Sequence, residues 1–117
     1  MRKISELLNE FHLTQRLEGR APKYIDLCRH RLKRWHEYTV KVCGIEIIDD
    51  VKASHIRAYI GYCQELGLEK NITINGNLST IKLFFTYLVD EEYIGEFNNP
   101  TRKVKDLRED KRVITTF

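Results

Sequence analysis

The stretch Asn71–Leu88, NITINGNLSTIKLFFTYL, changes at its midpoint from short polar residues to apolar and aromatic ones. On a helical wheel, one apolar stripe crosses both halves within about 40° of its first member. The stripe consists of Ile74, Leu78, Ile81, Phe85 and Leu88. The stretch is therefore predicted to be one helix that begins at an Asn71 N-cap and extends to about Glu92.

The side of this helix opposite the stripe carries short, uncharged residues in place of the Lys and Glu that favour solvated helices. It consists of Thr73, Asn75, Gly76, Ser79 and Thr80, with Leu83 at its end. Gly76 alone costs a helix about 0.5–1 kcal/mol relative to Ala, which points to a close approach by another surface. A nucleic-acid groove fits, because Asn, Ser and Thr can bond to base edges and phosphates. Packing against the helix predicted at 22–42, or an ordinary solvent face, fits the same pattern.

The remaining chain also shows helical periodicity, with no alternating strand pattern beyond Ile45–Ile48. Further helices are predicted over Lys3–Arg16, Pro22–Val42 and Ala53–Leu66. The connector Cys43–Asp50 is predicted to tuck its isoleucines under the bundle, and a short fifth helix or an extended tail follows Pro100. The predicted fold is an all-α bundle of four main helices in one domain, residues 1–100, followed by a basic linker over residues 101–117.

The predicted helix at 22–42 has one inward face and one basic face. Inward residues step by 4, 3, 4, 3 and 4: Ala21, Ile25, Cys28, Leu32, Trp35 and Thr39. The opposite face holds Lys23, Leu27, His30, Arg31 and Arg34. The block Arg16–His36 holds seven Lys and Arg against two acids, and Arg102–Arg112 holds six against three. Although the net charge is only +3, these blocks indicate a polarised surface that suits a polyanion.

The three cysteines, Cys28, Cys43 and Cys63, are odd in number and widely spaced. This pattern predicts free, mostly buried thiols in a reducing compartment. Cys28 and His30 diverge on a helix and no C-x-x-C pair occurs, so no metal site is expected. No apolar run approaches the roughly 20 residues that cross a bilayer, and no secretory signal is present. A cytoplasmic protein without a membrane partner is expected.

Four segments of the chain, in this order, resemble the tyrosine recombinases of the phage-integrase family. They are RAPKYIDLCRHRLKRWHEY, ASHIRAYIGYCQELG, TINGNLSTIKLFFTYLVDEEYI and NNPTRKVK. The most specific part is the pattern from Thr73 to Val89, followed by Asn99 and Pro100 after an acidic Tyr-Ile turn. Over Ile4–Arg112 the chain is similar to the amino-terminal SAM-like, core-binding domain of that family.

This resemblance implies a four-helix domain that forms one half of a C-shaped clamp on double-stranded DNA at the recombination core site. The helices at 22–42 and 71–92 would face the major groove, and the basic segment after Pro100 would run along the DNA. Together with the basic face of helix 22–42, the resemblance indicates these DNA-binding residues: Lys23, His30, Arg31, Arg34, Thr73, Asn75, Ser79, Lys82, Arg102, Lys103 and Lys105. Other recombinase protomers on DNA are the implied protein partners, and the isolated domain is expected to be monomeric.

The chain departs from the family pattern at four positions. Cys28 stands where an aromatic residue is common, which changes packing, and Lys52 stands where a Thr or Ser cap is common. Gly76 and Asn77 replace residues that are often basic in the family, so the family's sequence-specific contacts with DNA do not carry over to these two positions.

The catalytic machinery that the family implies is expected to lie outside this chain. Family members break and rejoin DNA with a Tyr nucleophile supported by Arg, Lys and His or Trp groups in a second domain. The resemblance implies no cofactor, because this chemistry conserves the phosphodiester energy in the protein–DNA link. None of the tyrosines here has an Arg and His constellation at motif spacing, so this fragment is not expected to be an enzyme. The predicted function is therefore the DNA-binding domain of a site-specific recombinase. The alternative is a helical protein-interaction module that docks a partner through exposed Leu27, Leu83 and Tyr87.

Overall fold

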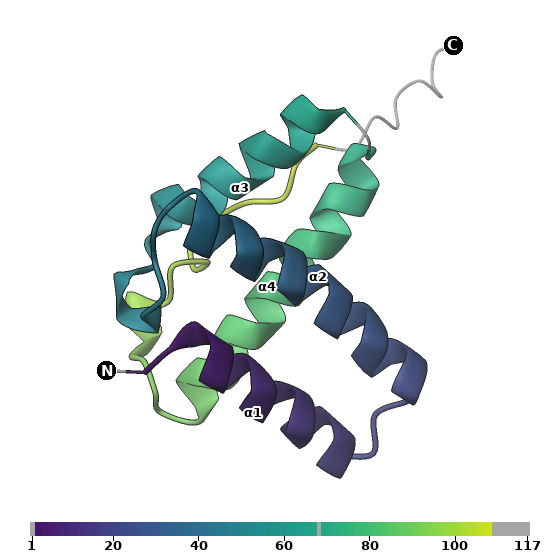
Figure 1. Cartoon of the computed structure of the whole chain (residues 1–117), viewed down its shortest axis with the longest axis vertical. Helices are drawn as coiled ribbons and strands as arrows, with labels where there is room; N and C mark the ends of the chain where they lie inside the picture. The colour runs from purple at the N-terminus through teal and green to yellow at the C-terminus, as the bar shows by residue number, and fades with distance from the viewer. Residues whose placement is uncertain (1, 68, 109–117) are drawn as a thin grey trace.

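The computed structural model describes residues 2–67 and 69–108 of the chain. These residues form four α-helices and two single-turn 3-10 helices, with no β-strand among them (Figure 1). The elements in chain order are α1 (Ile4–Leu17), α2 (Pro22–Lys41), η1 (Ile48–Asp50), α3 (Ala53–Leu66), α4 (Asn71–Asp90) and η2 (Glu96–Asn98). The predicted all-α bundle of four main helices is confirmed, and each helix ends within two residues of its predicted position.

Helix α4 is the central element of the bundle and contacts α1, α2 and α3. Helices α1 and α2 pack against each other, with α1 toward the C-terminal half of α4 and α3 toward its N-terminal half (Figure 1). The predicted stripe of α4 is confirmed as core, because all five of its residues are 0 or 1 % exposed. Phe84, which lies outside that stripe, is also fully buried, with its ring 5.6 Å from Phe11 and 6.0 Å from Trp35 between centroids. A helix enclosed by three neighbours buries more than one stripe.

Two predictions about helix starts are wrong. The N-cap of α4 is Lys70, whereas Asn71 is the first helical residue and its side-chain amide donates to the Arg108 carbonyl at 3.0 Å. That acceptor comes from a distant part of the chain, so the local sequence carries no sign of it. Ala21 is the exposed N-cap of α2, and the buried stripe begins one turn later at Ile25, because the turn between α1 and α2 holds Ala21 away from the core.

The connector between α2 and α3 closes one end of the bundle. Ile45 and Ile48 are buried and Ile47 is half-buried, so the predicted tucking under the bundle is confirmed. The amino-terminal end of α1 is tied to this connector, since the Ile4 N–H donates to the Glu46 carbonyl at 2.9 Å. The connector thereby joins the first and third helices of the bundle.

After η2 the chain turns and continues without helix as far as Arg108. Thr101 and Val104 are each 5 % exposed, so this segment packs against the bundle. Of the two predicted arrangements after Pro100, the extended tail is the one found up to Arg108. The rest of the predicted linker, residues 109–117, lies outside the described residues.

All three cysteines are free; Cys28 and Cys63 are buried and Cys43 is half-buried, as predicted. Burial raises the pKa of the Cys43 and Cys63 thiols. Over residues 2–67 and 69–108, no group of three His, Cys, Asp or Glu side chains could hold a metal ion. No helix in that part of the chain is long and apolar enough to cross a membrane.

Removal of the buried Tyr59 hydroxyl is expected not to destabilise the protein. Tyr59 is 1 % exposed, and its hydroxyl has no hydrogen-bond partner in the described structure apart from the weakly interacting Cys63 thiol. An unsatisfied buried hydroxyl costs about 1–3 kcal/mol, so we expect Tyr59→Phe to leave the free energy of unfolding unchanged or to raise it by up to about 1 kcal/mol. Urea denaturation measures this change.

Tyr87→Phe is the matched control for Tyr59→Phe. The Tyr87 hydroxyl donates to Glu10 at 3.2 Å and lies 3.3 Å from the Thr14 hydroxyl. Its removal is expected to cost about 0.5–1.5 kcal/mol. An equal loss of stability in the two variants would show that the Tyr59 hydroxyl is well satisfied in the folded protein.

The buried His12 and the half-buried His36 lead us to expect that stability falls in mild acid. Burial lowers the pKa of His12 and of His36, and the nearby charge of Arg29 lowers that of His12 further. Below the ordinary pKa of about 6.5, the unfolded chain then binds more protons than the folded chain, so stability decreases as the pH falls through this value. We expect the free energy of unfolding to drop between pH 7 and pH 5, and His12→Gln to reduce that drop. Urea denaturation at three pH values measures this drop, and His30→Gln, at an exposed site, is the control. If the free energy of unfolding changes equally with pH in His12→Gln and in the wild type, the prediction is wrong.

Candidate nucleic-acid interface

The open face of α4 is narrower than the sequence indicates. Thr73 and Ser79 are exposed and Gly76 is half-buried, whereas Asn75 is 6 % and Thr80 is 5 % exposed. The prediction that all five residues form one open face is therefore wrong for Asn75 and Thr80. Two parts of the fold cover them, namely α2 on one side of α4 and the C-terminal segment on the other.

Helix α2 covers its side of α4 through one arginine. The Arg31 guanidinium donates to the Gly76 carbonyl at 3.1 Å and to the Thr80 hydroxyl at 3.2 Å. A Cβ atom at position 76 would lie 2.8 Å from Arg31 Nη2, so the glycine makes room for the guanidinium. Packing against α2 was one of the explanations for the short residues of α4, and the structure confirms it for these positions.

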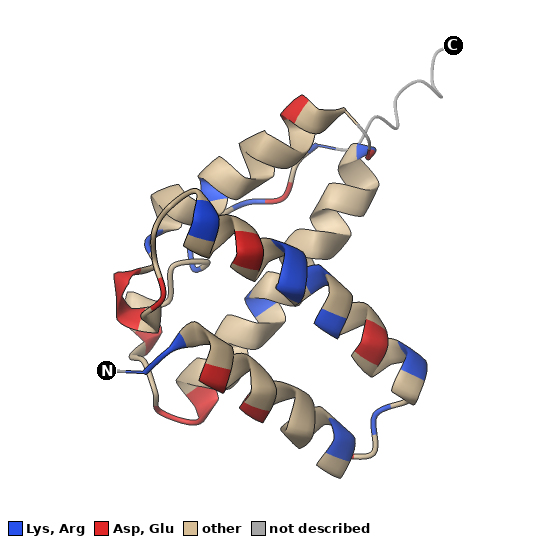
Figure 2. Ribbon diagram, viewed as in Figure 1, with Lys and Arg blue, Asp and Glu red and all other residues tan. Residues whose placement is uncertain are grey.

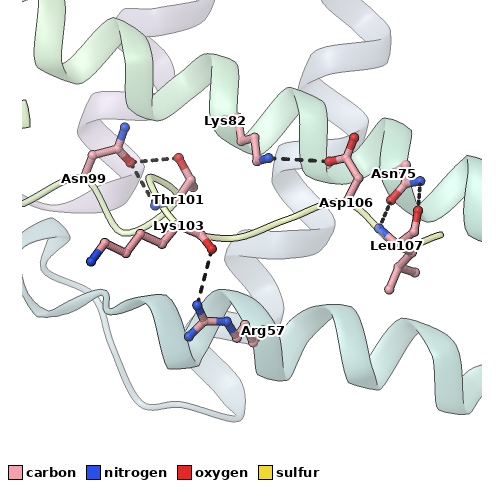
Figure 3. A network of polar contacts seen from close by, with 8 residues as sticks. All are labelled: Arg57, Asn75, Lys82, Asn99, Thr101, Lys103, Asp106 and Leu107. Carbon is pink, nitrogen blue, oxygen red and sulfur yellow. Dashed lines mark hydrogen bonds and ion pairs between the residues drawn. The ribbon is translucent and has the colours of Figure 1, made fainter.

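The C-terminal segment, residues 101–108, covers the other side of α4; we call it the strap (Figure 3). Asn75 donates to the Leu107 carbonyl at 2.8 Å and accepts from the Leu107 N–H at 2.7 Å. The Lys82 ammonium lies 3.5 Å from Asp106 in the strap. The strap therefore engages two residues of α4 that the sequence assigned to DNA contact.

A second ion pair lies between α2 and the turn before α4. The Arg34 guanidinium donates to the Glu69 carboxylate at 2.9 Å, and the two side chains are 32 % and 20 % exposed. The hydrogen bond to Glu69 raises the pKa of Arg34. The Asn77 amide lies 3.4 Å from the same carboxylate, so Glu69 links α2 to α4. Part of the positive charge that Arg34 could offer to a polyanion is neutralised by this pair.

Other predicted contacts remain at the surface. Lys23 and His30 are exposed on α2, and Lys103 and Lys105 are exposed on the strap. The Arg102 guanidinium stacks over the Phe97 ring, 4.6 Å from its centroid. These residues offer positive charge or hydrogen-bond donors on both sides of α4.

The charged residues are unevenly distributed over the bundle. Lys and Arg recur along α2 and the strap, whereas several acidic residues lie at the end of the bundle that holds η1 and the C-terminus of α4 (Figure 2). Arg57 on α3 joins the basic set, since it lies 3.5 Å from the Lys103 carbonyl (Figure 3). The sequence analysis missed Arg57 because it stands outside both basic blocks, and only the docking of the strap brings it close.

Before its last turn, the open part of α4 consists of polar and apolar side chains without charge. The exposed residues there are Ile72, Thr73, Ser79, Leu83 and Thr86, and the exposed Asp90 ends the helix. Hydroxyl groups can bond to either base edges or phosphates, and apolar groups can contact the thymine methyl group. The arrangement can therefore meet a nucleic-acid groove while neighbouring cations contact the backbone.

Comparison with known families identifies the domain. The family model described as the phage integrase N-terminal SAM-like domain matches residues 9–92. The chain belongs to this family. Neither the curated proteins nor the solved structures compared with the chain give a match.

For the integrase-family domain, the match covers α1 from Asn9 onward, all of α2 and α3, and all of α4. The sequence-based assignment to the tyrosine recombinases is confirmed over this range, which is shorter than the predicted Ile4–Arg112. The strap follows the matched residues, so its contacts with α4 are a property of this chain that the family match does not describe.

Proposed function

We propose that this domain binds double-stranded DNA as one half of the clamp of a site-specific tyrosine recombinase, which acts in the cytoplasm in DNA integration or recombination. The observation that carries the proposal is the open face of α4, uncharged up to the exposed Asp90 at its end, between the exposed cations of α2 and the strap. Membership of the integrase family supports it. A catalytic domain and further recombinase protomers are the proposed partners on DNA, and the isolated domain is proposed to be monomeric.

The proposed contacts divide by side-chain chemistry. Exposed lysines meet phosphates, which supplies most of the affinity and makes it sensitive to salt; these are Lys23, Lys103 and Lys105. The His30 ring offers a hydrogen-bond donor to the same phosphates. Thr73 and Ser79 meet base edges or phosphates from the open face of α4. Four further residues remain in the proposed set, although each also makes an intramolecular contact described above: Arg31, Arg34, Lys82 and Arg102.

Fluorescence anisotropy with a labelled duplex tests the proposal. Without a catalytic partner, we expect largely non-specific binding with a Kd of about 10⁻⁴–10⁻⁶ M at physiological salt. The affinity is expected to fall steeply when the salt concentration rises from 50 to 200 mM, because released counterions drive the binding. No binding at 50 mM salt would refute DNA binding by the isolated domain.

The second candidate function is a protein-interaction module, and exposed apolar residues favour it. Leu27 is 42 %, Leu83 39 % and Ile72 61 % exposed on α2 and α4. Tyr87 contributes less than predicted, because it is half-buried and its hydroxyl is bonded to Glu10. Sedimentation of the free domain together with the anisotropy titration separates the two candidates. Self-association without any DNA binding would favour the interaction module.

A further inference from the structure

The strap runs along α4 in the opposite direction to the helix. Successive strap residues meet α4 residues of decreasing number: Asp106 pairs with Lys82, Leu107 with Asn75, and Arg108 with Asn71. The strap turns over residues 101–103 and then continues without turn or helix from Val104 to Arg108. The strap therefore follows α4 from Lys82 back to Asn71, and its described part ends near the start of this helix (Figure 1).

Asn75 holds the strap through its main chain. Its carboxamide makes a donor bond and an acceptor bond with the same residue, Leu107, as a neighbouring β-strand would (Figure 3). Asn75 itself is only 6 % exposed, so water competes weakly for these bonds. Val104, at 5 % exposure, anchors the strap in the core from the other side of Asp106. Both hydrogen bonds are made to backbone atoms, so they do not depend on which side chain stands at position 107.

A direct contact between Asn75 and DNA would require both bonds to Leu107 to break and the strap to leave α4. The helix offers hydroxyl groups at Thr73 and Ser79 that reach its open face without such a rearrangement. The burial of Asn75 and its double hydrogen bond thus favour a role within the protein.

We propose that Asn75 is a positioning residue, which clamps the strap to α4 and thereby holds the chain beside this helix as far as Arg108, next to Asn71. The strap stays docked when DNA is bound. The clamp in the free domain rests on the contacts of the strap alone, whereas its persistence on DNA rests on the proposed function.

Amide hydrogen exchange at Leu107, followed by NMR, tests the clamp. In the wild-type protein the Leu107 N–H is expected to be protected, because it donates to Asn75 Oδ1. Asn75→Ala removes both bonds and is expected to speed exchange of this amide by about tenfold to thirtyfold. Asn75→Asp keeps an acceptor for the N–H but loses the donor to the carbonyl, so an intermediate rate is expected. The amides of Phe84 and Phe85 report whether each variant remains folded.

Ser79→Ala is the matched control, because Ser79 lies one turn away on the open face of α4 and should leave the Leu107 rate unchanged. Exchange at the unprotected rate in the wild type, or an unchanged rate in Asn75→Ala with α4 intact, overturns the proposal.

Added duplex should leave the Leu107 amide protected, and Asn75→Ala should bind the duplex within about threefold of the wild type. Loss of Leu107 protection on adding DNA would show that Asn75 is released and would also overturn it. A failure to bind DNA at all would affect only the proposed function, since the exchange experiment without DNA stands by itself.

Discussion

Replacement of Phe84 by Ala is expected to lower the free energy of unfolding by about 3–5 kcal/mol. Phe84 is 0 % exposed, and its ring contacts those of Phe11, Trp35 and Phe85, so it joins α1, α2 and α4 at the centre of the bundle. Truncation removes the transfer free energy of the ring and leaves a cavity that three helices cannot all close. Since small domains are stable by about 5–15 kcal/mol, this single change removes a large fraction of the total. Urea denaturation followed by circular dichroism measures the loss.

Phe97→Ala is the matched control for this substitution. Phe97 is 77 % exposed, and its ring contacts the Arg102 guanidinium. The same chemical change at this position is expected to alter stability by no more than about 1 kcal/mol. Comparable losses in the two variants would mean that α4 does not form the centre of the core.

The double substitution Lys103→Gln with Lys105→Gln is expected to have the largest effect on DNA binding. If each lysine neutralises one phosphate, counterion release makes each contact worth about eightfold in affinity at 0.1 M salt. The pair should then weaken binding about 60-fold and reduce the slope of log affinity against log salt by about 2. Both side chains are exposed on the strap, so the bundle itself should remain folded. Anisotropy titrations across a salt series measure both quantities.

Lys3→Gln with Lys41→Gln is the control, because it removes the same charge from exposed positions outside the predicted interface. We expect it to change the affinity by less than about threefold, since distant surface charges are screened beyond about 10 Å at 0.1 M salt. Equal weakening by the two double variants would show that net charge, and no particular surface, governs binding. An unchanged salt slope in Lys103→Gln with Lys105→Gln would remove the strap from the proposed interface.

The sequence predicted the helices and the core well because both depend on local periodicity. The stripe of Ile74, Leu78, Ile81, Phe85 and Leu88 is buried as expected, and so are the inward residues of α2 from Ile25 to Thr39. Phe84 was missed as a core residue, since a wheel shows one stripe at a time and does not say how many neighbours surround the helix. The same limitation led to the errors at Asn71 and Ala21, where the environment of a helix start depends on distant segments.

For the candidate site, the sequence indicated which residues are unusual but not what they contact. The short residues at positions 75, 76 and 80 did signal a close approach, and the surfaces found there are the guanidinium of Arg31 and the backbone of Leu107. Arg31 is 45 residues away from Gly76, and Leu107 is 32 residues away from Asn75. A small residue on a helix indicates that another surface lies close to it. The type of residue alone does not show whether that surface is DNA or protein.

The sequence by itself thus determined the all-α class, the positions of four helices, the central stripe of α4 and the resemblance to the integrase family, since each follows from local order along the chain. Only the tertiary structure decided which polar residues of α4 stay open. Their exposure depends on where α2 and the strap dock. That docking is set by the summed packing of Val104, Leu107 and Arg31 against residues far away in the chain, which no local pattern encodes.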